Sequence, residues 1–270
     1  MRCFALPEIN LTEPLLINAE RSAVHLWLKA HSNSQSLITQ QLTQRQQLSL
    51  AQLVPLLLCG EQSAVHVFHN EQQRLQQIIS VDCAMPDTKT APLQNTVAQT
   101  QQSAQLNLQK IEADERLHEQ ALQFLLAQLP QHPLQHKSKR IAQQFYAKIQ
   151  QPGQSIAEHF QSIALLDSCV CILMNAVAKS SIRDSAIAEL FHLIKKDEAK
   201  HVAIARKYSE LLCQQSGDSK AFADTRKVPE LLVKMLESQA AAFENLGIDS
   251  HDLFVKLLDC NCYQRHRESR

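Results

Sequence analysis

Glycine and aromatic residues are scarce in this chain of 270 residues, which has 4 glycines and only 5% Phe, Trp and Tyr together. A β-sheet fold needs glycine in tight turns and many aromatic and β-branched residues on its pleated faces. The chain is rich instead in Gln, Leu, Ala, Glu and Lys, which helix interiors tolerate well. This scarcity argues against a β-sheet fold and predicts an all-α protein.

Net charge is also missing, since Lys+Arg and Asp+Glu number 27 each. Without an overall electrostatic field, the chain is not expected to hold nucleic acid or an anionic membrane surface. Residues 1–10 lack the basic segment and apolar stretch of a secretion signal. No run is expected to approach the roughly 20 apolar residues of a membrane span. We predict a cytoplasmic protein that binds neither nucleic acid nor a membrane.

The 8 cysteines include no C-x-x-C pair, so the sequence does not indicate a thiolate metal site. Most of them are expected to be reduced, buried small residues. Cys260 and Cys262 lie two positions apart. For this pair, metal binding or oxidation stays open beside simple packing.

Apolar periodicity predicts four long helices, at residues 48–77, 103–129, 154–180 and 185–213. This number indicates a four-helix bundle. The short Ser180–Ser181 turn makes the third and fourth helices antiparallel neighbours. Between the second and third helices, Pro130, Pro133 and a short helix over 140–150 form a connection long enough for a crossover.

Further helices are predicted on both sides of the bundle. The chain divides into an N-terminal arm, the bundle and a C-terminal part, at residues 1–47, 48–213 and 214–270, within a single domain. The arm carries one helix over Ala19–Ala30. The C-terminal part carries helices over Pro229–Asn245 and Ser250–Cys260, with Gly247 as the helix stop and Ser250 as the cap. These helices are expected to pack on the bundle.

Two of the predicted bundle helices carry the same motif, Asp-Glu-x-x-His, in the middle of an apolar stripe. The motif occurs at Asp114-Glu115-Arg116-Leu117-His118 and at Asp197-Glu198-Ala199-Lys200-His201. In each copy the Glu and the His take two core-facing positions one helical turn apart. A buried carboxylate without a partner is costly, so these side chains need partners. Metal ions are one such partner.

A third Glu-x-x-His, at Glu189 and His192, shows that spacing alone does not make a site. Glu189 lies nine positions before Glu198 and therefore about half a turn round the helix. It shares its face with Ser185 and Lys196. We expect this copy to be a solvated pair on the helix surface.

Single acids occupy the same level on the other two bundle helices. Asp167 interrupts the stripe of the third helix, and Glu158 is its competitor as a ligand. Glu158 lies nine residues earlier, on the opposite face and close to the helix start, where an acid favours the helix dipole. A surface acid is the preferred reading for Glu158, although the choice between the two residues stays open.

Glu61 is the single acid in the stripe of the first helix. Pro55 lies six residues before it, and inside a helix proline removes a hydrogen bond. The first helix is therefore expected to begin near Pro55 or to kink there. His66 and His69 lie off the Glu61 face and are expected at the surface.

Four carboxylates and two imidazoles form a donor set that suits iron or manganese better than zinc. The predicted ligands are Glu61, Glu115, His118, Asp167, Glu198 and His201. Their order along residues 48 to about 213, a single acid followed by Glu-x-x-His and then the same again, resembles the ferritin-like di-iron carboxylate superfamily. The resemblance implies a ferritin-like four-helix bundle with two Fe ions, or Mn, bridged by Glu115 and Glu198. One departure is Asp167, where most members have Glu.

The resemblance also implies that Asp114 and Asp197 hydrogen-bond the ligand histidines, with surface solvation as the alternative reading. Leu193–Tyr208 and Asn245–Ile248 look similar to the di-iron arylamine N-oxygenases. Those enzymes carry an extra His where this chain has Ile194, which argues against N-oxygenation.

Within this superfamily the extra helices favour a dioxygen-activating oxidoreductase, an oxygenase or hydroxylase acting on a small organic substrate. Such an enzyme would need dioxygen, the substrate and an electron donor such as a ferredoxin or a reductase. A homodimer stays open. The alternatives are a ferroxidase or iron-handling ferritin-like protein, and a metal-free helical interaction protein.

Overall fold

The structure, a computed structural model, describes residues 22–32, 37–82, 91–149, 155–216 and 227–260. The regular elements of these segments are all helices, and none of the described residues forms a strand, as predicted for an all-α protein. Four long helices dominate: α3 (Gln44–Asp82), α4 (Ala91–Gln128), α6 (Ile156–Ala178) and α7 (Ala186–Ser216). They correspond to the four helices predicted from apolar periodicity.

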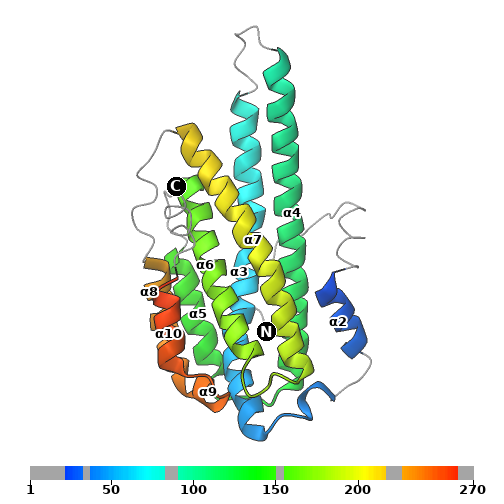
Figure 1. The fold of residues 1–270 in the computed structure, drawn as a ribbon, viewed down its shortest axis with the longest axis vertical. Helices are drawn as coiled ribbons and strands as arrows, with labels where there is room; N and C mark the ends of the chain where they lie inside the picture. The colour runs from blue at the N-terminus through cyan, green and yellow to red at the C-terminus, as the bar shows by residue number, and fades with distance from the viewer. Residues whose placement is uncertain (1–21, 33–36, 83–90, 150–154, 217–226, 261–270) are drawn as a thin grey trace.

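The four long helices associate in two pairs. α3 packs on α4, and α6 packs on α7. α3 and α7 run in one direction, and α4 and α6 run in the other (Figure 1). Because α4 and α6 are parallel, the chain must return along the molecule between them. The helix α5 (Gln135–Ile149) makes this return and packs on α3.

Local sequence signals explain where two of these helices begin. Ser155 caps α6: its hydroxyl accepts a hydrogen bond from the backbone N–H of Glu158, and its own N–H donates to the Glu158 carboxylate. At α3, Thr43 and Gln46 exchange the same two bonds. The helix then continues through Pro55, which excludes one of the two alternatives predicted for that residue, a helix start, and leaves the other, a kink. The Thr-x-x-Gln pattern at residue 43 was the better start signal.

Smaller helices pack around the four long ones. The first, α2 (Ala23–Ser32), is anchored by Trp27, whose indole N–H donates to the carbonyl of Ala186 at 2.9 Å. The first half of the predicted N-terminal arm lies outside the described residues. At the other end, α8 (Lys227–Leu236) contacts α5 and α6, α9 (Ala240–Asn245) contacts α3, and α10 (Ser250–Leu258) contacts α6.

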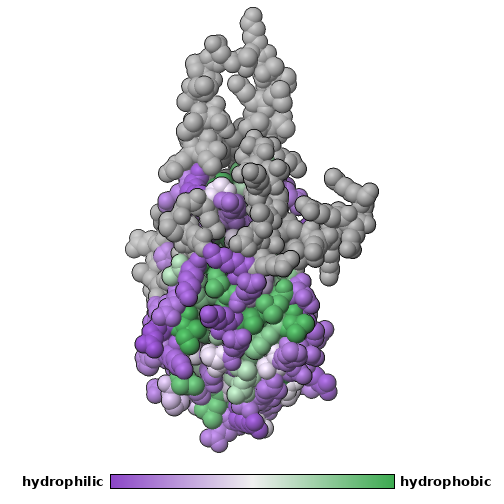
Figure 2. Space-filling view, turned by 90° about the vertical axis from the view of Figure 1, so that its left-hand side faces the viewer, coloured by the Kyte–Doolittle hydropathy of each residue, from purple (hydrophilic) through white to green (hydrophobic). Residues whose placement is uncertain are grey.

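Two details of the C-terminal part differ from the prediction. The helix expected over Pro229–Asn245 is interrupted by a 3₁₀ turn at Glu237–Gln239, where buried Gln239 accepts a hydrogen bond from Gln52 of α3. A tertiary contact therefore accompanies the break. Gly247 ends the segment with φ +74°, as predicted, but Asp249 rather than Ser250 caps α10. The face that α5, α8 and α10 cover shows scattered apolar side chains among polar ones (Figure 2).

Two described helices are long and apolar enough to cross a membrane, by length and composition only. They are Gln44–Arg74 and Ile156–Ala178, with mean hydropathies of 1.3 and 1.7. The expectation that no segment approaches a span therefore does not hold. In the fold, 72% and 56% of these stretches are buried inside the protein, and core helices of soluble proteins pass the same test. The finding is weak evidence for a membrane span.

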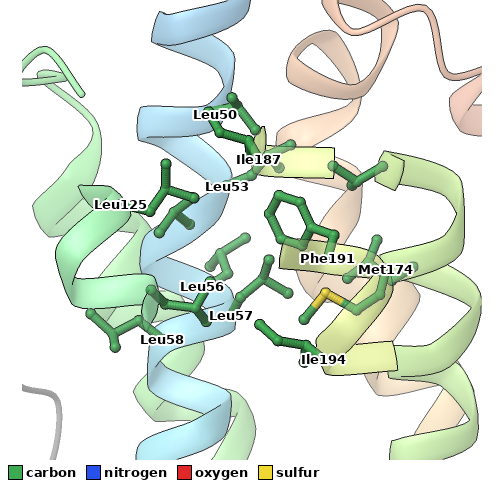
Figure 3. Packing of buried hydrophobic residues seen from close by; sticks show 14 of the residues in the cluster. Leu50, Leu53, Leu56, Leu57, Leu58, Leu125, Met174, Ile187, Phe191 and Ile194 are labelled. Atoms are coloured by element: carbon green, nitrogen blue, oxygen red, sulfur yellow. The ribbon is translucent and has the colours of Figure 1, made fainter. Parts of the chain in front are cut away.

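The apolar core is divided into two clusters. The larger one includes Leu57 of α3, Leu125 of α4, Met174 of α6 and Phe191 of α7, which point toward one another in Figure 3. The second cluster lies nearer the other end of these helices and includes Phe68, Phe160 and Tyr208. The predicted acids lie in the sequence between these two sets on every long helix, and each predicted histidine follows the acid of its helix by three residues.

Candidate metal centre

The acids and histidines that interrupt the predicted stripes are buried, as are most of the described apolar residues of these stripes. The buried stripe residues include Leu50, Val54, Phe68, Leu108, Ile111, Leu122, Phe160, Ile163, Ile187, Ile194 and Ala205. Among the polar members, Glu61 of α3, Glu115 and His118 of α4, and Glu198 of α7 each offer one ligand atom, and these atoms lie within 4.8 Å of one another. Four side chains from three helices thus form a group that could hold a metal ion.

His118 lies at the centre of this group and is fully buried. Its Nδ1 atom is 3.3 Å from a carboxylate oxygen of Glu61 and 3.4 Å from one of Glu198. Its Nε2 atom is 3.5 Å from Asp197 of α7. The ring is therefore oriented with Nδ1 toward the carboxylates and Nε2 toward an aspartate.

His201 has the same arrangement from the opposite side. Its Nδ1 atom is 3.0 Å from Glu115 and 3.6 Å from Glu198, and its Nε2 atom is 3.5 Å from Asp114 of α4. Each aspartate thus faces the histidine of the other Asp-Glu-x-x-His motif. Of the two alternatives considered for Asp114 and Asp197, the structure thus places both aspartates beside the histidines.

Asp167 of α6 lies beside this group without belonging to its tightest part. It lines the same cavity as Glu61, Glu115 and Glu198. Its Oδ2 atom is buried and has no hydrogen-bond partner among the described residues. Its shorter side chain, one carbon less than Glu, keeps the carboxylate closer to its own helix.

Four buried carboxylates surround two imidazoles in this group, and the pKa values of these side chains depend on one another. Burial, and then repulsion by Glu115, raises the pKa of Glu61 well above its ordinary value. Burial, followed by repulsion from Glu198 and Glu115, does the same to the pKa of Asp167. Burial acts in the same sense on Glu115, but the neighbouring imidazoles of His118 and His201 outweigh it and lower its pKa.

Both histidines respond to the surrounding carboxylates. Burial opposes their charged forms, but contacts with Asp197 and three glutamates raise the pKa of His118 well above its ordinary value. Asp114, Glu115 and Glu198 raise the pKa of His201 in the same way. Burial also works against the charge of Asp197, yet bonds from His118 and Lys200 bring its pKa down to about 2. Protons on the histidines balance the carboxylates, as cations bound there would.

Several polar atoms in the group lack hydrogen bonds of good geometry. Within the described part of the chain they include both carboxylate oxygens of Glu115, Nε2 of His118, both ring nitrogens of His201 and Oδ2 of Asp167. Orphaned polar atoms at this density are unusual in a folded protein. Carboxylate and imidazole donors of this kind fit iron or manganese ions.

The structure separates these residues from the alternatives considered in the sequence. Glu189 and His192 are exposed, as expected for a solvated pair. Glu158 belongs to the α6 cap, which leaves Asp167 as the acid of that helix near the group. His66 and His69, expected at the surface, are both half-buried, and His69 lies 3.4 Å from the buried carboxylate of Glu112.

Tyr146 is a site residue that the sequence did not reveal. It comes from the crossover helix α5, is buried, and lines the cavity with Glu61 and Asp167. Burial and the neighbouring carboxylates, Glu61 first, raise the pKa of its hydroxyl. A Cβ atom on Gly60 would lie 2.6 Å from that hydroxyl oxygen. The sequence contained one indication of this contact, since a glycine inside a predicted helix is costly and usually marks a place where another side chain packs closely against the backbone.

A cavity adjoins the group, and the space within it that the centre of a water-sized sphere can reach is about 60 Å³. Besides the four acids, its walls are mostly apolar side chains of α3 and α6, with Tyr146 and Ile149 of α5. His159 also lines it, and its Nδ1–H donates a short hydrogen bond of 2.6 Å to the buried carboxylate of Glu71 on α3. Glu71 continues the Glu61–Ala64–Phe68 stripe by one more step, a signal that was available in the sequence.

Among the described cysteines, Cys169, Cys171, Cys213 and Cys260 form no disulfide bond, in line with the prediction that most are reduced. Cys59 is the exception and is disulfide-bonded. Cys262 lies outside the described residues, so the Cys260–Cys262 alternative stays a prediction.

Comparison of the whole chain with protein-family models, curated proteins and solved structures finds no match. The residues themselves must therefore carry the functional argument.

Proposed function

We propose that this chain is a ferritin-like di-iron protein that activates dioxygen to oxidise a small organic substrate. The observation that carries the proposal is the buried group of Glu61, Glu115, His118 and Glu198, which opens onto a mostly apolar cavity. Neither feature is needed for packing alone. Together they supply what an oxygenase needs, a metal site beside a place that excludes water.

Six residues would hold the two ions. They are Glu61, Glu115, His118, Asp167, Glu198 and His201. Four carboxylates would neutralise two divalent cations, which accounts for the unpaired oxygen atoms of Glu115 and Asp167. When bound, the ions would supply dioxygen binding and its reduction. Iron is the metal proposed, with manganese as the second choice.

The chain's own residues would prepare the site for that chemistry. Asp197 and Asp114 face the Nε2 atoms of His118 and His201, so each imidazole presents Nδ1 to the carboxylates. A carboxylate behind a ligand histidine holds its tautomer and raises its basicity. Tyr146, packed against Gly60, closes one side of the cavity. Apolar walls would keep water from the substrate.

The apolar cavity favours an oxygenase or hydroxylase over iron storage, since a storage site must pass hydrated iron rather than hold an organic molecule. A metal-free interaction protein would leave the orphaned atoms of Glu115 and His201 without a role. The enzyme would also need an electron donor, such as a ferredoxin or a reductase, and we propose that it works in the cytoplasm.

A pair of variants on α7 tests the metal site. Glu198→Ala removes a buried acid of the group, and Glu189→Ala removes an exposed acid of the same helix that also heads a Glu-x-x-His. Each protein is loaded with Fe(II) without oxygen and then exposed to dioxygen. We expect about two irons per chain in the wild type and in Glu189→Ala, and loss of most iron and dioxygen uptake in Glu198→Ala.

Equal iron content and dioxygen uptake in the two variants would reject the site. Dioxygen uptake that stops after iron oxidation, in the presence of an electron donor and a broad set of small organic compounds, would point to a ferroxidase instead.

A further inference from the structure

The cavity beside the metal group has a second polar end. His159 of α6 and Asp167 line the same cavity, and eight residues separate them on one helix. At 1.5 Å per residue this places them about 12 Å apart along the helix axis. Val67, Phe68, Ile163 and Leu166 form the walls between them. The cavity is therefore apolar in its middle and polar at both ends.

His159 is held in one orientation by a buried acid. Its Nδ1 atom is 2.6 Å from Oε1 of Glu71, and only 1% of the Glu71 side chain is exposed. Arg74 donates to the same oxygen at 2.7 Å, so Glu71 accepts two donors there as a carboxylate. Since a carboxylate can only accept, Nδ1 of His159 carries a proton and donates it to this bond.

The other ring nitrogen is left for a ligand. Within the described ranges, no residue is hydrogen-bonded to Nε2 of His159. The nearby cavity residue Ser162 directs its hydroxyl to the backbone carbonyl of Glu158. In the neutral ring whose Nδ1 carries the proton, Nε2 is an acceptor. A ligand group that donates an O–H or N–H matches it.

We propose that His159, held by Glu71, binds the polar head of the substrate, and that the substrate is an apolar molecule with an O–H or N–H donor at one end. Its other end then lies beside Glu61, Glu115, Asp167 and Glu198, where oxidation would occur. As a description of the substrate this rests on the proposed function. As a binding site it stands on the cavity and the Glu71–His159 pair alone.

Two isomeric probes test the head group. 1-Hexanol and methyl pentyl ether have the same atoms, but only the alcohol carries an O–H donor, and hexanoate offers an anionic head on the same chain. Dissociation constants are measured by ligand-observed NMR on the full-length protein, metal-free and iron-loaded. One hydrogen bond to Nε2 should make 1-hexanol bind about three- to ten-fold more tightly than the ether.

Three variants test whether the preference for 1-hexanol over the ether depends on His159 and Glu71. His159→Leu should remove it while leaving ether binding nearly unchanged. His251→Leu, at an exposed position on α10, should retain it. Glu71→Gln, which no longer holds the proton on Nδ1, should weaken it and give mixed tautomers in the ¹⁵N spectrum of the His159 ring. Helical circular dichroism checks that each variant is folded.

Equal binding of alcohol and ether to the wild type, tightest binding of hexanoate, no binding of any probe, or an unchanged preference in His159→Leu would each overturn the proposal. A protein that binds iron but shows one of these results retains the proposed function and loses this inference. A protein that shows the preference for the alcohol but binds no iron retains this binding site and loses the proposed function.

Discussion

At the scale of single residues, the contact between Gly60 and Tyr146 accounts for a glycine in the middle of α3. A Cβ atom at residue 60 would lie 2.6 Å from the Tyr146 hydroxyl oxygen but 3.5 Å from the ring carbon that bears it. Only the hydroxyl therefore excludes alanine. The ring cannot easily give way, because Tyr146 is buried against Phe145 and the core.

We expect Gly60→Ala to lower the free energy of unfolding by about 1–3 kcal/mol, as overpacking does. In the Tyr146→Phe background the same change should be neutral or should stabilise by up to about 1 kcal/mol, because alanine favours the helix. Denaturant unfolding of the wild type, the two single variants and the double variant gives the coupling free energy between residues 60 and 146. Additive effects would contradict the contact.

Asp167 is a residue at which metal binding and metal-free stability oppose each other. Its carboxylate is buried, has one orphaned oxygen and is repelled by Glu198 and Glu115. Asp167→Asn keeps the shape and removes the charge. We expect the metal-free variant to be at least as stable as the wild type and to bind less iron. Lower metal-free stability with full iron content would show that Asp167 is a structural partner instead.

At the scale of elements, the start of α6 shows how a cap and a candidate ligand can be told apart. Glu158 and Ser155 form the capping box. Glu158→Ala and Ser155→Ala should each lower the free energy of unfolding by about 1 kcal/mol, the usual value of a cap, and both should keep full iron content. Loss of iron in Glu158→Ala alone would make Glu158 a ligand after all.

At the scale of the whole molecule, the acidic group makes metal-free stability depend on pH. His118 and His201 have raised pKa values, and so do Glu61 and Asp167. Each of these groups keeps its proton in the folded state at a pH where the unfolded chain has released it. By linkage, stability must then fall as pH rises.

For the histidines the full contribution is present below their ordinary pKa of 6.5 and is lost as pH rises through the higher folded value. We expect the melting temperature of the metal-free protein to fall steadily from pH 6.5 to pH 9. Bound iron replaces the protons, and its affinity rises with pH. The iron-loaded protein should therefore show a flat or opposite trend in thermal unfolding. A flat metal-free curve would contradict the shifted pKa values.

The sequence by itself determined the all-α class, the four long helices and the inward direction of Glu61, Glu115, His118, Glu198 and His201. Helical periodicity is a local property, so the position of each acid in an apolar stripe decides whether it is buried. The same argument placed Glu189 and His192 outside. Helix starts were predicted less well: the cap read at Ser250 is formed by Asp249, and the Thr43 capping pattern of α3 was missed.

Tertiary structure alone decided which stripes meet and at what level. The pairing of Asp114 with His201 and of Asp197 with His118, the cover of Tyr146 over Glu61, and the bond between Glu71 and His159 all join residues far apart in the chain. Such contacts depend on which helices are neighbours, how far each is rotated and how deep each side chain reaches. Periodicity along one helix carries no information about these quantities.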